Sequence, residues 1–162
     1  MDLEKIIKAL ADHDVDYVIV GGVAAVLYGS TYSTNDLDLC YSRDGSNLKA
    51  LVSALAPFQP RLRGKNLPNN LPFHFDPETL KHGLNFTLTT TAGDVDLIGE
   101  IKGVGQFKDL VKNAQKIKVF GVICHVISLD DLIQAKKAAG RGKDLIMVKE
   151  LEAIAELQRK KQ

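Results

Sequence analysis

The sequence predicts an α/β (α+β) fold in which one mixed β-sheet is flanked by helices and the C-terminus is helical. Apolar, β-branched runs such as residues 15–20 alternate with stretches whose apolar residues recur every three or four positions. The 162 residues, 45% hydrophobic and 25% charged, suit a globular protein with one proper core. We therefore expect a single domain over residues 1–162, with an α/β core at 1–127 and C-terminal helices at 128–162.

The first half of the chain is predicted to alternate helices with strands. Leucines and isoleucines at helical spacing mark its helices, and β-branched or alternating residues mark its strands. In chain order we expect a helix at 3–11, a strand at 15–20, a short helix at 23–28, a strand at 36–41 and a helix at 48–55. Gly21-Gly22 is expected to form the turn before the short helix, and Gly29 its C-cap.

The second half begins with residues 57–77, which hold all five prolines and are predicted to form a long functional or mobile loop. Beyond it we expect strand pairs at 84–91 with 94–100 and at 116–120 with 122–127, and helices at 107–111, 128–139 and 143–158. Ser128 is a typical N-cap for the helix that begins there.

Charge and composition exclude several classes of protein. The net charge of +1 argues against tight, sequence-independent binding of nucleic acid. Cys40 and Cys124 lie in apolar runs and are expected to be buried, reduced thiols. No run approaches the roughly 20 apolar residues that span a bilayer, and the N-terminus lacks a signal-peptide pattern. We expect a cytoplasmic protein with no membrane partner.

Asp36 and Asp38 are the most informative residues of the chain. Residues two apart in a strand point the same way, so these carboxylates share a face while Leu37 and Leu39 enter the core. Carboxylates held this close repel unless a cation or a proton lies between them. Hard oxygen ligands suit Mg²⁺ or Mn²⁺, and phosphate oxygens commonly complete the coordination of Mg²⁺. This face is therefore a predicted metal site.

A third acid is expected from the strand at 94–100, where Asp94 and Asp96 share a face. Asp96 is preferred because Val95 and Leu97 flank it within the strand, while Asp94 lies near the turn and remains the alternative. A third carboxylate would complete a two-metal site or act as general base for a substrate hydroxyl.

Phosphate-binding groups are expected beside these acids. Gly21 and Gly22 stand where a strand feeds a helix, and glycine there lets a phosphate approach exposed backbone N–H groups. The same pair is also compatible with a simple tight turn. The hydroxyls of Ser30 and Thr34 are further candidates, although loop hydroxyls often satisfy local backbone groups instead.

Together these residues resemble the nucleotidyltransferase superfamily that includes DNA polymerase β. The matching pattern runs Val20-Gly21-Gly22, thirteen residues, then Asp36-Leu37-Asp38-Leu39. Gly29, Thr34 and the later Arg141-Gly142-Lys143-Asp144 resemble a small prokaryotic branch that includes abortive-infection toxin nucleotidyltransferases.

The resemblance implies transfer of a nucleoside monophosphate from a nucleoside triphosphate (NTP) to an acceptor hydroxyl, with release of pyrophosphate. It implies that Asp36 and Asp38 bind both metals, that Asp96 binds the catalytic one, and that Gly21 and Gly22 hold the triphosphate. Lys143 matches the basic position of the later motif and is a further candidate for nucleotide binding. The acceptor stays open among an RNA end, a protein and a small molecule, and the toxin branch implies an antitoxin-like protein partner.

Tyr32 departs from the pattern, because the branch usually has arginine two residues before the threonine. Arg43, Lys136, Arg141 and Lys143 are candidates to replace that cation. The departure favours a second hypothesis, a catalytically weak nucleotide-binding or partner subunit of a two-component, toxin–antitoxin-like system. A structural interaction protein with solvated acids is a third.

Overall fold

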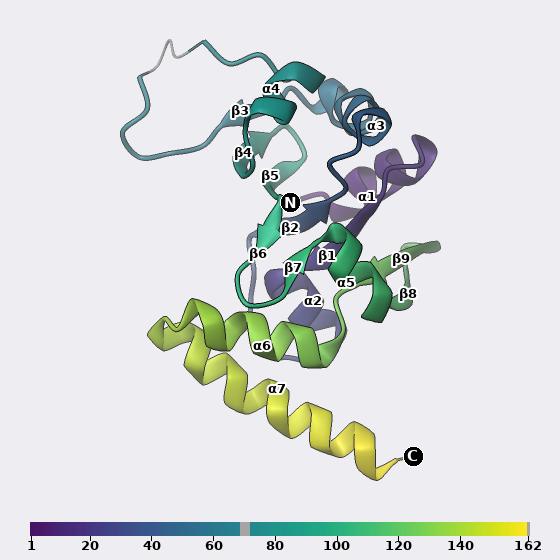
Figure 1. Cartoon of the computed structure of the whole chain (residues 1–162), viewed down its shortest axis with the longest axis vertical. Helices are drawn as coiled ribbons and strands as arrows, with labels where there is room; N and C mark the ends of the chain where they lie inside the picture. Colours follow the sequence, from purple (N-terminus) through teal and green to yellow (C-terminus); the bar gives the residue numbers. More distant parts are fainter. Residues whose placement is uncertain (69–71, 162) are drawn as a thin grey trace.

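The computed structural model describes residues 1–68 and 72–161 and contains a seven-stranded mixed sheet (Figure 1). The strand order is β3-β4-β5-β2-β1-β9-β8, which confirms the predicted mixed α/β fold. In chain order the strands are β1 (Tyr17–Val20), β2 (Asp36–Tyr41), β3 (Arg61–Leu62), β4 (Phe86–Thr90), β5 (Gly93–Ile98), β8 (Gln115–Val119) and β9 (Val122–Val126). A separate small ladder joins β6 (Glu100–Ile101) to β7 (Gly105–Gln106).

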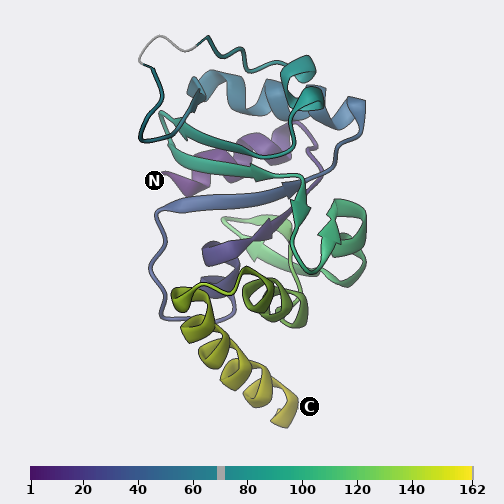
Figure 2. The same ribbon diagram turned by 60° about the vertical axis from the view of Figure 1, so that its left-hand side comes forward.

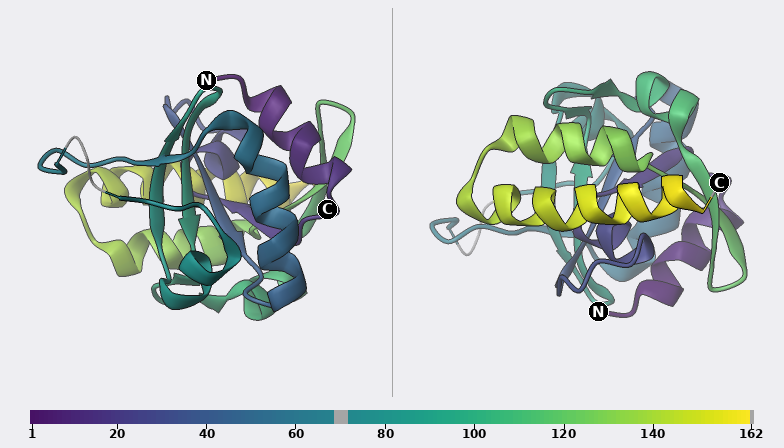
Figure 3. Two further views of the ribbon diagram at one scale, coloured as in Figure 1. Left: turned by 90° about the horizontal axis from the view of Figure 1, so that it is seen from above. Right: turned by 90° about the horizontal axis from the view of Figure 1, so that it is seen from below.

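Helices lie on both sides of the sheet (Figure 2). Those that pack with one another at one end are α1 (Leu3–Asp12), α3 (Gly45–Leu55), with the 3₁₀ turn η1 (Ala56–Phe58) after it, and α4 (Pro77–His82). The remaining helices are α2 (Gly21–Leu27), α5 (Phe107–Asn113), α6 (Leu129–Ala139) and α7 (Gly142–Lys160). Figure 3 shows α6 and α7 side by side, with the long α7 along the surface.

The structure adds two short elements that were not predicted, one inside the expected loop at 57–77 and one that begins at its last residue. Helix α4 begins at Pro77, and the carboxylate of Asp76 accepts a hydrogen bond from the backbone N–H of Thr79, 2.8 Å away. Strand β3 exists because two residues pair with Thr89 and Leu88 of β4. Helix α2 begins at Gly21 rather than at Val23, and the left-handed φ of Gly21 turns the chain directly from β1 into the helix.

The central strand β2 fixes one chemical face of the sheet. It pairs antiparallel with β1 and parallel with β5, in a register that sets Asp38 opposite Asp96. Side chains alternate along the strand, so Leu37 and Leu39 point to the other face, where they are fully buried. The acids of β2 and β5 consequently gather on the face opposite this apolar layer.

Asn47 of α3 ties β1 to β2 at the end away from these acids. Its amide donates to the carbonyls of Asp16 (3.0 Å) and Ser42 (2.8 Å), and its side-chain oxygen accepts from the N–H of Asp16 (2.7 Å). Asp16 immediately precedes β1 and Ser42 immediately follows β2, so one buried amide holds the antiparallel pair in its register.

The sequence-based expectations for the cysteines are confirmed: Cys40 and Cys124 are buried free thiols. Within residues 1–68 and 72–161, every helix is too short or too polar to be a candidate for crossing a bilayer.

Replacing Asn47 by alanine is expected to lower the free energy of unfolding by about 2–3 kcal/mol, because buried backbone groups lose their partners. Urea unfolding followed by circular dichroism measures the change. Asn113→Ala, at the exposed end of α5, is the matched control and should change stability little. Equal effects of the two substitutions would contradict a special role for Asn47.

Candidate functional site

Three carboxylates converge on the polar face of the sheet. Asp36 and Asp38 come from β2 and Asp96 from β5, and one oxygen of each lies within 4.8 Å of the others. Asp94, the alternative third acid, lies outside this group, and its Oδ1 accepts a hydrogen bond from the hydroxyl of Thr89 at 2.6 Å. The geometry therefore favours Asp96 over Asp94 as the third member; we call these three residues the acid cluster.

Burial and like charge act together on Asp38. Burial is the larger cause, and the nearby carboxylates of Asp36 and Asp96 add to it, so the pKa of Asp38 rises to about 7. Burial also raises the pKa of Asp96, against the opposing effect of the Arg63 guanidinium. The Oδ1 atom of Asp38 is buried and, among the described residues, has no hydrogen-bond partner. Three hard oxygen donors, one of them unpaired, fit a divalent cation such as Mg²⁺.

The two glycines are required by close packing of neighbouring side chains. Gly21 has a φ of +66°, and a Cβ there would overlap the carboxylate of Asp38. A Cβ at Gly22 would crowd the side chain of Thr34. The pair thus lets β2 and its preceding loop approach the start of α2, which accounts for both residues without a ligand.

A buried carboxylate on α7 gathers positive charge beside the acid cluster. Asp144 is only 1% exposed, and its pKa is held below the usual value chiefly by hydrogen bonds from Arg141. The Arg141 Nε donates to Asp144 Oδ2 at 2.6 Å, and Lys136 Nζ of α6 lies 3.5 Å from Asp144 Oδ1. These contacts hold one lysine and one arginine next to the acids.

Two adjoining cavities meet at this point. The polar one, of about 280 Å³, is lined by the acid cluster together with Gly22, Thr34 and the cations of α6 and α7. The other, of about 240 Å³, has mainly apolar walls from β1, β5, β6 and α6. Asp38, Lys136 and Arg141 line both cavities, so a charged boundary separates a polar space from an apolar one.

The remaining predicted residues occupy different places. Thr34 lines the polar cavity, and its hydroxyl donates to the backbone oxygen and Oδ1 of Asp36 at 3.1 and 3.2 Å. Lys143 is exposed at the rim, near Tyr32. The buried Ser30 hydroxyl accepts from the N–H of Tyr32 and is not among the residues lining the polar cavity.

Of the four cations proposed to replace the missing arginine, three lie at the polar cavity and one does not. Lys136, Arg141 and Lys143 line the polar cavity. Arg43 instead donates to Tyr41 and to backbone oxygens of α4.

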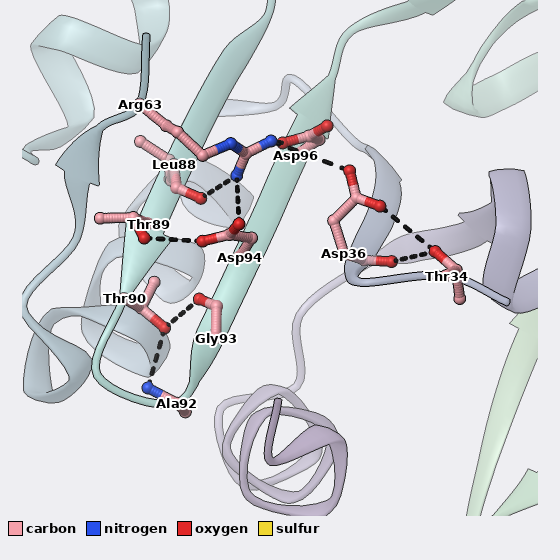
Figure 4. A network of polar contacts seen from close by, with 10 residues as sticks. All are labelled: Thr34, Asp36, Arg63, Leu88, Thr89, Thr90, Ala92, Gly93, Asp94 and Asp96. Atoms are coloured by element: carbon pink, nitrogen blue, oxygen red, sulfur yellow. Dashed lines mark hydrogen bonds and ion pairs between the residues drawn. The ribbon is translucent and has the colours of Figure 1, made fainter. Parts of the chain in front are cut away.

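Arg63 is a residue that sequence reasoning missed. Its Nη2 donates to Asp96 Oδ1 at 2.7 Å, so a cation already contacts the acid cluster (Figure 4). Arg63 follows β3 inside the proline-rich segment, and its position depends on the pairing of β3 with β4. No local pattern in the sequence carries that information.

Asp38→Asn is expected to stabilise the metal-free protein in a pH-dependent way. The carboxyl of Asp38 has a pKa of about 7 in the folded protein and 3.8 as its ordinary value. The free energy of unfolding therefore falls as pH rises between those values, because the folded protein must bury the charged form. The variant should gain roughly 2–4 kcal/mol over the wild type above pH 7 and little below pH 4, at about 1.4 kcal/mol per pKa unit. Urea unfolding from pH 4 to 8 measures the difference; a pH-independent difference would contradict the assignment.

Comparison with known proteins identifies the fold. No protein-family model matches the chain, and no curated protein matches it. Among solved structures, a Thermotoga maritima protein described as a "putative nucleotidyltransferase" is 18% identical and superposes with a TM-score of 0.58. The match covers 98% of this chain and 91% of that one. At this identity the likeness concerns architecture alone: this chain has a nucleotidyltransferase-like fold.

Proposed function

We propose that the chain is a metal-dependent nucleotidyltransferase that moves a nucleoside monophosphate from an NTP to an acceptor hydroxyl and releases pyrophosphate. The observation that carries this proposal is the acid cluster, three carboxylates within 4.8 Å beside a cavity with cationic walls. Such a cavity offers ligands for a cation and counter-charges for an anionic substrate. The nucleotidyltransferase-like fold supports the same class of reaction.

The acid cluster would hold Mg²⁺ or Mn²⁺ in this proposal. When bound, the ion supplies Lewis-acid stabilisation of phosphoryl oxygens. Thr34 positions Asp36 through the hydrogen bond between their side chains. Lys136 and Arg141 lie on the wall of the cavity and would neutralise the triphosphate.

The backbone of Gly21 and Gly22 is the proposed second contact for the phosphates. Gly22 lines the polar cavity, and Gly21 lines the apolar one. Lys143 would act at the rim and Ser30 further out, so we assign them weaker contributions.

In the transfer step, the acceptor oxygen attacks the α-phosphorus, and the bond from that phosphorus to the oxygen of pyrophosphate breaks. Asp96 would take the proton of the acceptor hydroxyl, because its carboxylate lines the polar cavity beside the proposed metal site. The pyrophosphate leaves with the electron pair of the broken bond. Most of the rate acceleration would come from holding the two reactants in line and from charge stabilisation.

The second candidate function is a catalytically weak nucleotide-binding or partner subunit. Tyr32 favours it, because this side chain is 41% exposed at the mouth of the polar cavity, where the branch usually has a cation. A cytoplasmic location and an antitoxin-like partner remain predictions from sequence.

Asp96→Asn is expected to reduce label transfer from α-³²P-labelled NTPs by at least about 100-fold, since it removes both a metal ligand and a base. The assay contains Mg²⁺ and, as separate acceptors, total RNA, cell protein and small-molecule extract. Asp130→Asn, on the exposed first turn of α6, is the matched control and should keep full activity. Transfer by the wild type but also by Asp96→Asn would refute the role of Asp96. Mg²⁺-dependent NTP binding without transfer to any acceptor would support the binding subunit.

Asp144→Asn is expected to weaken Mg²⁺–NTP binding by about tenfold, because it frees Lys136 and Arg141 from their shared carboxylate. Calorimetry with a nonhydrolysable NTP analogue gives the affinity. Glu152→Gln, which removes an exposed ion pair with Lys137, serves as control. Unchanged affinity in folded Asp144→Asn would argue against a positioning role.

A further inference from the structure

We propose that Arg63 is an internal competitor of the divalent cation: its guanidinium neutralises the acid cluster in the metal-free protein and leaves Asp36 and Asp96 when the ion binds. The inference rests on the metal site of the proposed function, and it does not depend on the transfer reaction. It assigns Arg63 a role in setting metal affinity.

The contacts of one guanidinium nitrogen coincide with the proposed metal ligands. Nη2 lies 2.7 Å from Asp96 Oδ1 and 3.8 Å from Asp36 Oδ2, which are two of the three cluster residues. Figure 4 shows the guanidinium beside Asp96 with Asp36 reaching toward it. A metal ion that takes oxygens of these carboxylates as ligands would lie close to the positive charge of the guanidinium, so the two cations repel each other.

The other nitrogen is anchored outside the acid cluster. Nη1 donates to the carbonyl of Leu88 at 2.6 Å and lies 3.6 Å from Asp94 Oδ2. Asp94 is itself held by the hydroxyl of Thr89, so groups of both β4 and β5 anchor this nitrogen. The backbone N–H of Arg63 also donates to the carbonyl of Thr87. The side chain can therefore give up its Nη2 contacts while Nη1 keeps its own.

Arg63 differs in this respect from two cations of the polar cavity, Lys136 and Arg141. Lys136 and Arg141 form their ion pairs with Asp144, whereas the ion pairs of Asp36 and Asp96 within residues 1–68 and 72–161 are made by Arg63. The Arg63 side chain is 30% exposed, so the end that carries Nη2 has room to swing away from Asp36 and Asp96. In this proposal Asp94 is the residue that keeps Arg63 near the acid cluster, through its contact with Nη1.

The test is calorimetric titration of MnCl₂ into the full chain without nucleotide. Arg63→Gln is expected to bind Mn²⁺ about tenfold more tightly than the wild type, because no guanidinium has to be displaced. Without metal the same variant should melt at a lower temperature, and saturating Mn²⁺ should remove that difference. Arg61→Gln, two residues earlier with an exposed side chain, is the matched control and should leave both readouts unchanged.

Arg63→Lys provides a second variant that keeps the charge but loses the forked geometry, and its Mn²⁺ affinity should lie between those of wild type and Arg63→Gln. Equal or weaker Mn²⁺ binding by Arg63→Gln overturns the competition. Failure of wild type, Arg63→Gln and Arg63→Lys alike to bind Mn²⁺ overturns both the competition and the proposed metal site. Competition observed together with a lack of transfer activity overturns only the transferase proposal.

Discussion

Mutual repulsion among three neighbouring carboxylates is the constraint on which the rest of the structure depends. Two unit charges a few ångströms apart repel by roughly 3–4 kcal/mol at an effective dielectric of about 20. The pairing of β2 with β5 nevertheless forces the charges together. A one-residue shift of a strand would avoid this, but it would turn the leucines of that strand to the polar face and its acids toward the core. Leu37, Leu39 and their partners on β5 are buried on the opposite face. At about 1.5–3 kcal/mol for each buried side chain, this apolar layer outweighs the repulsion.

The repulsion is relieved in separate ways by different parts of the chain. Asp38, with a pKa of about 7, can keep a proton near neutral pH. Arg63 brings a positive charge from the segment that follows β3. Lys136 and Arg141, which also line the cavity, share the single buried carboxylate of Asp144, which leaves a surplus of positive charge facing the cavity. In the proposed function, the acids would bind the metal ion and these cations the polyanionic substrate.

Local sequence patterns predicted the elements that carry the acids but not the contacts that join distant segments. The alternation in β2 gave its bounds at Asp36 and Tyr41, and Ser128 caps α6 through the N–H of Asp131. Helix α4 was missed although Asp76 and Pro77 are a recognisable helix start, because the prolines around them favoured a loop. Strand β3 has two residues and exists only through pairing with β4, so no periodicity reveals it.

The same distinction explains which site residues could be found. Asp36 and Asp38 stand two apart in one strand, so spacing alone puts them on one face. Arg63 and Asp96 are 33 residues apart in the chain. Their contact depends on the order of β3, β4 and β5 in the sheet. For the glycine pair, the sequence pattern suggested a phosphate site. In the folded chain, close contact with Asp38 and Thr34 is a second reason for glycine at both positions.

The C-terminal helices belong to the site as much as the sheet does. Glu150 of α7 accepts hydrogen bonds from the backbone N–H and hydroxyl of Thr31, both at 3.0 Å, and so ties the helix to the loop before β2. Six residues earlier on the same helix, Asp144 holds Lys136 and Arg141 at the cavity wall. A ligand that draws those cations inward therefore pulls on α7, and through Glu150 on the loop that leads to Asp36. Binding of the proposed nucleotide should thus be energetically linked to the packing of the two last helices through one buried carboxylate.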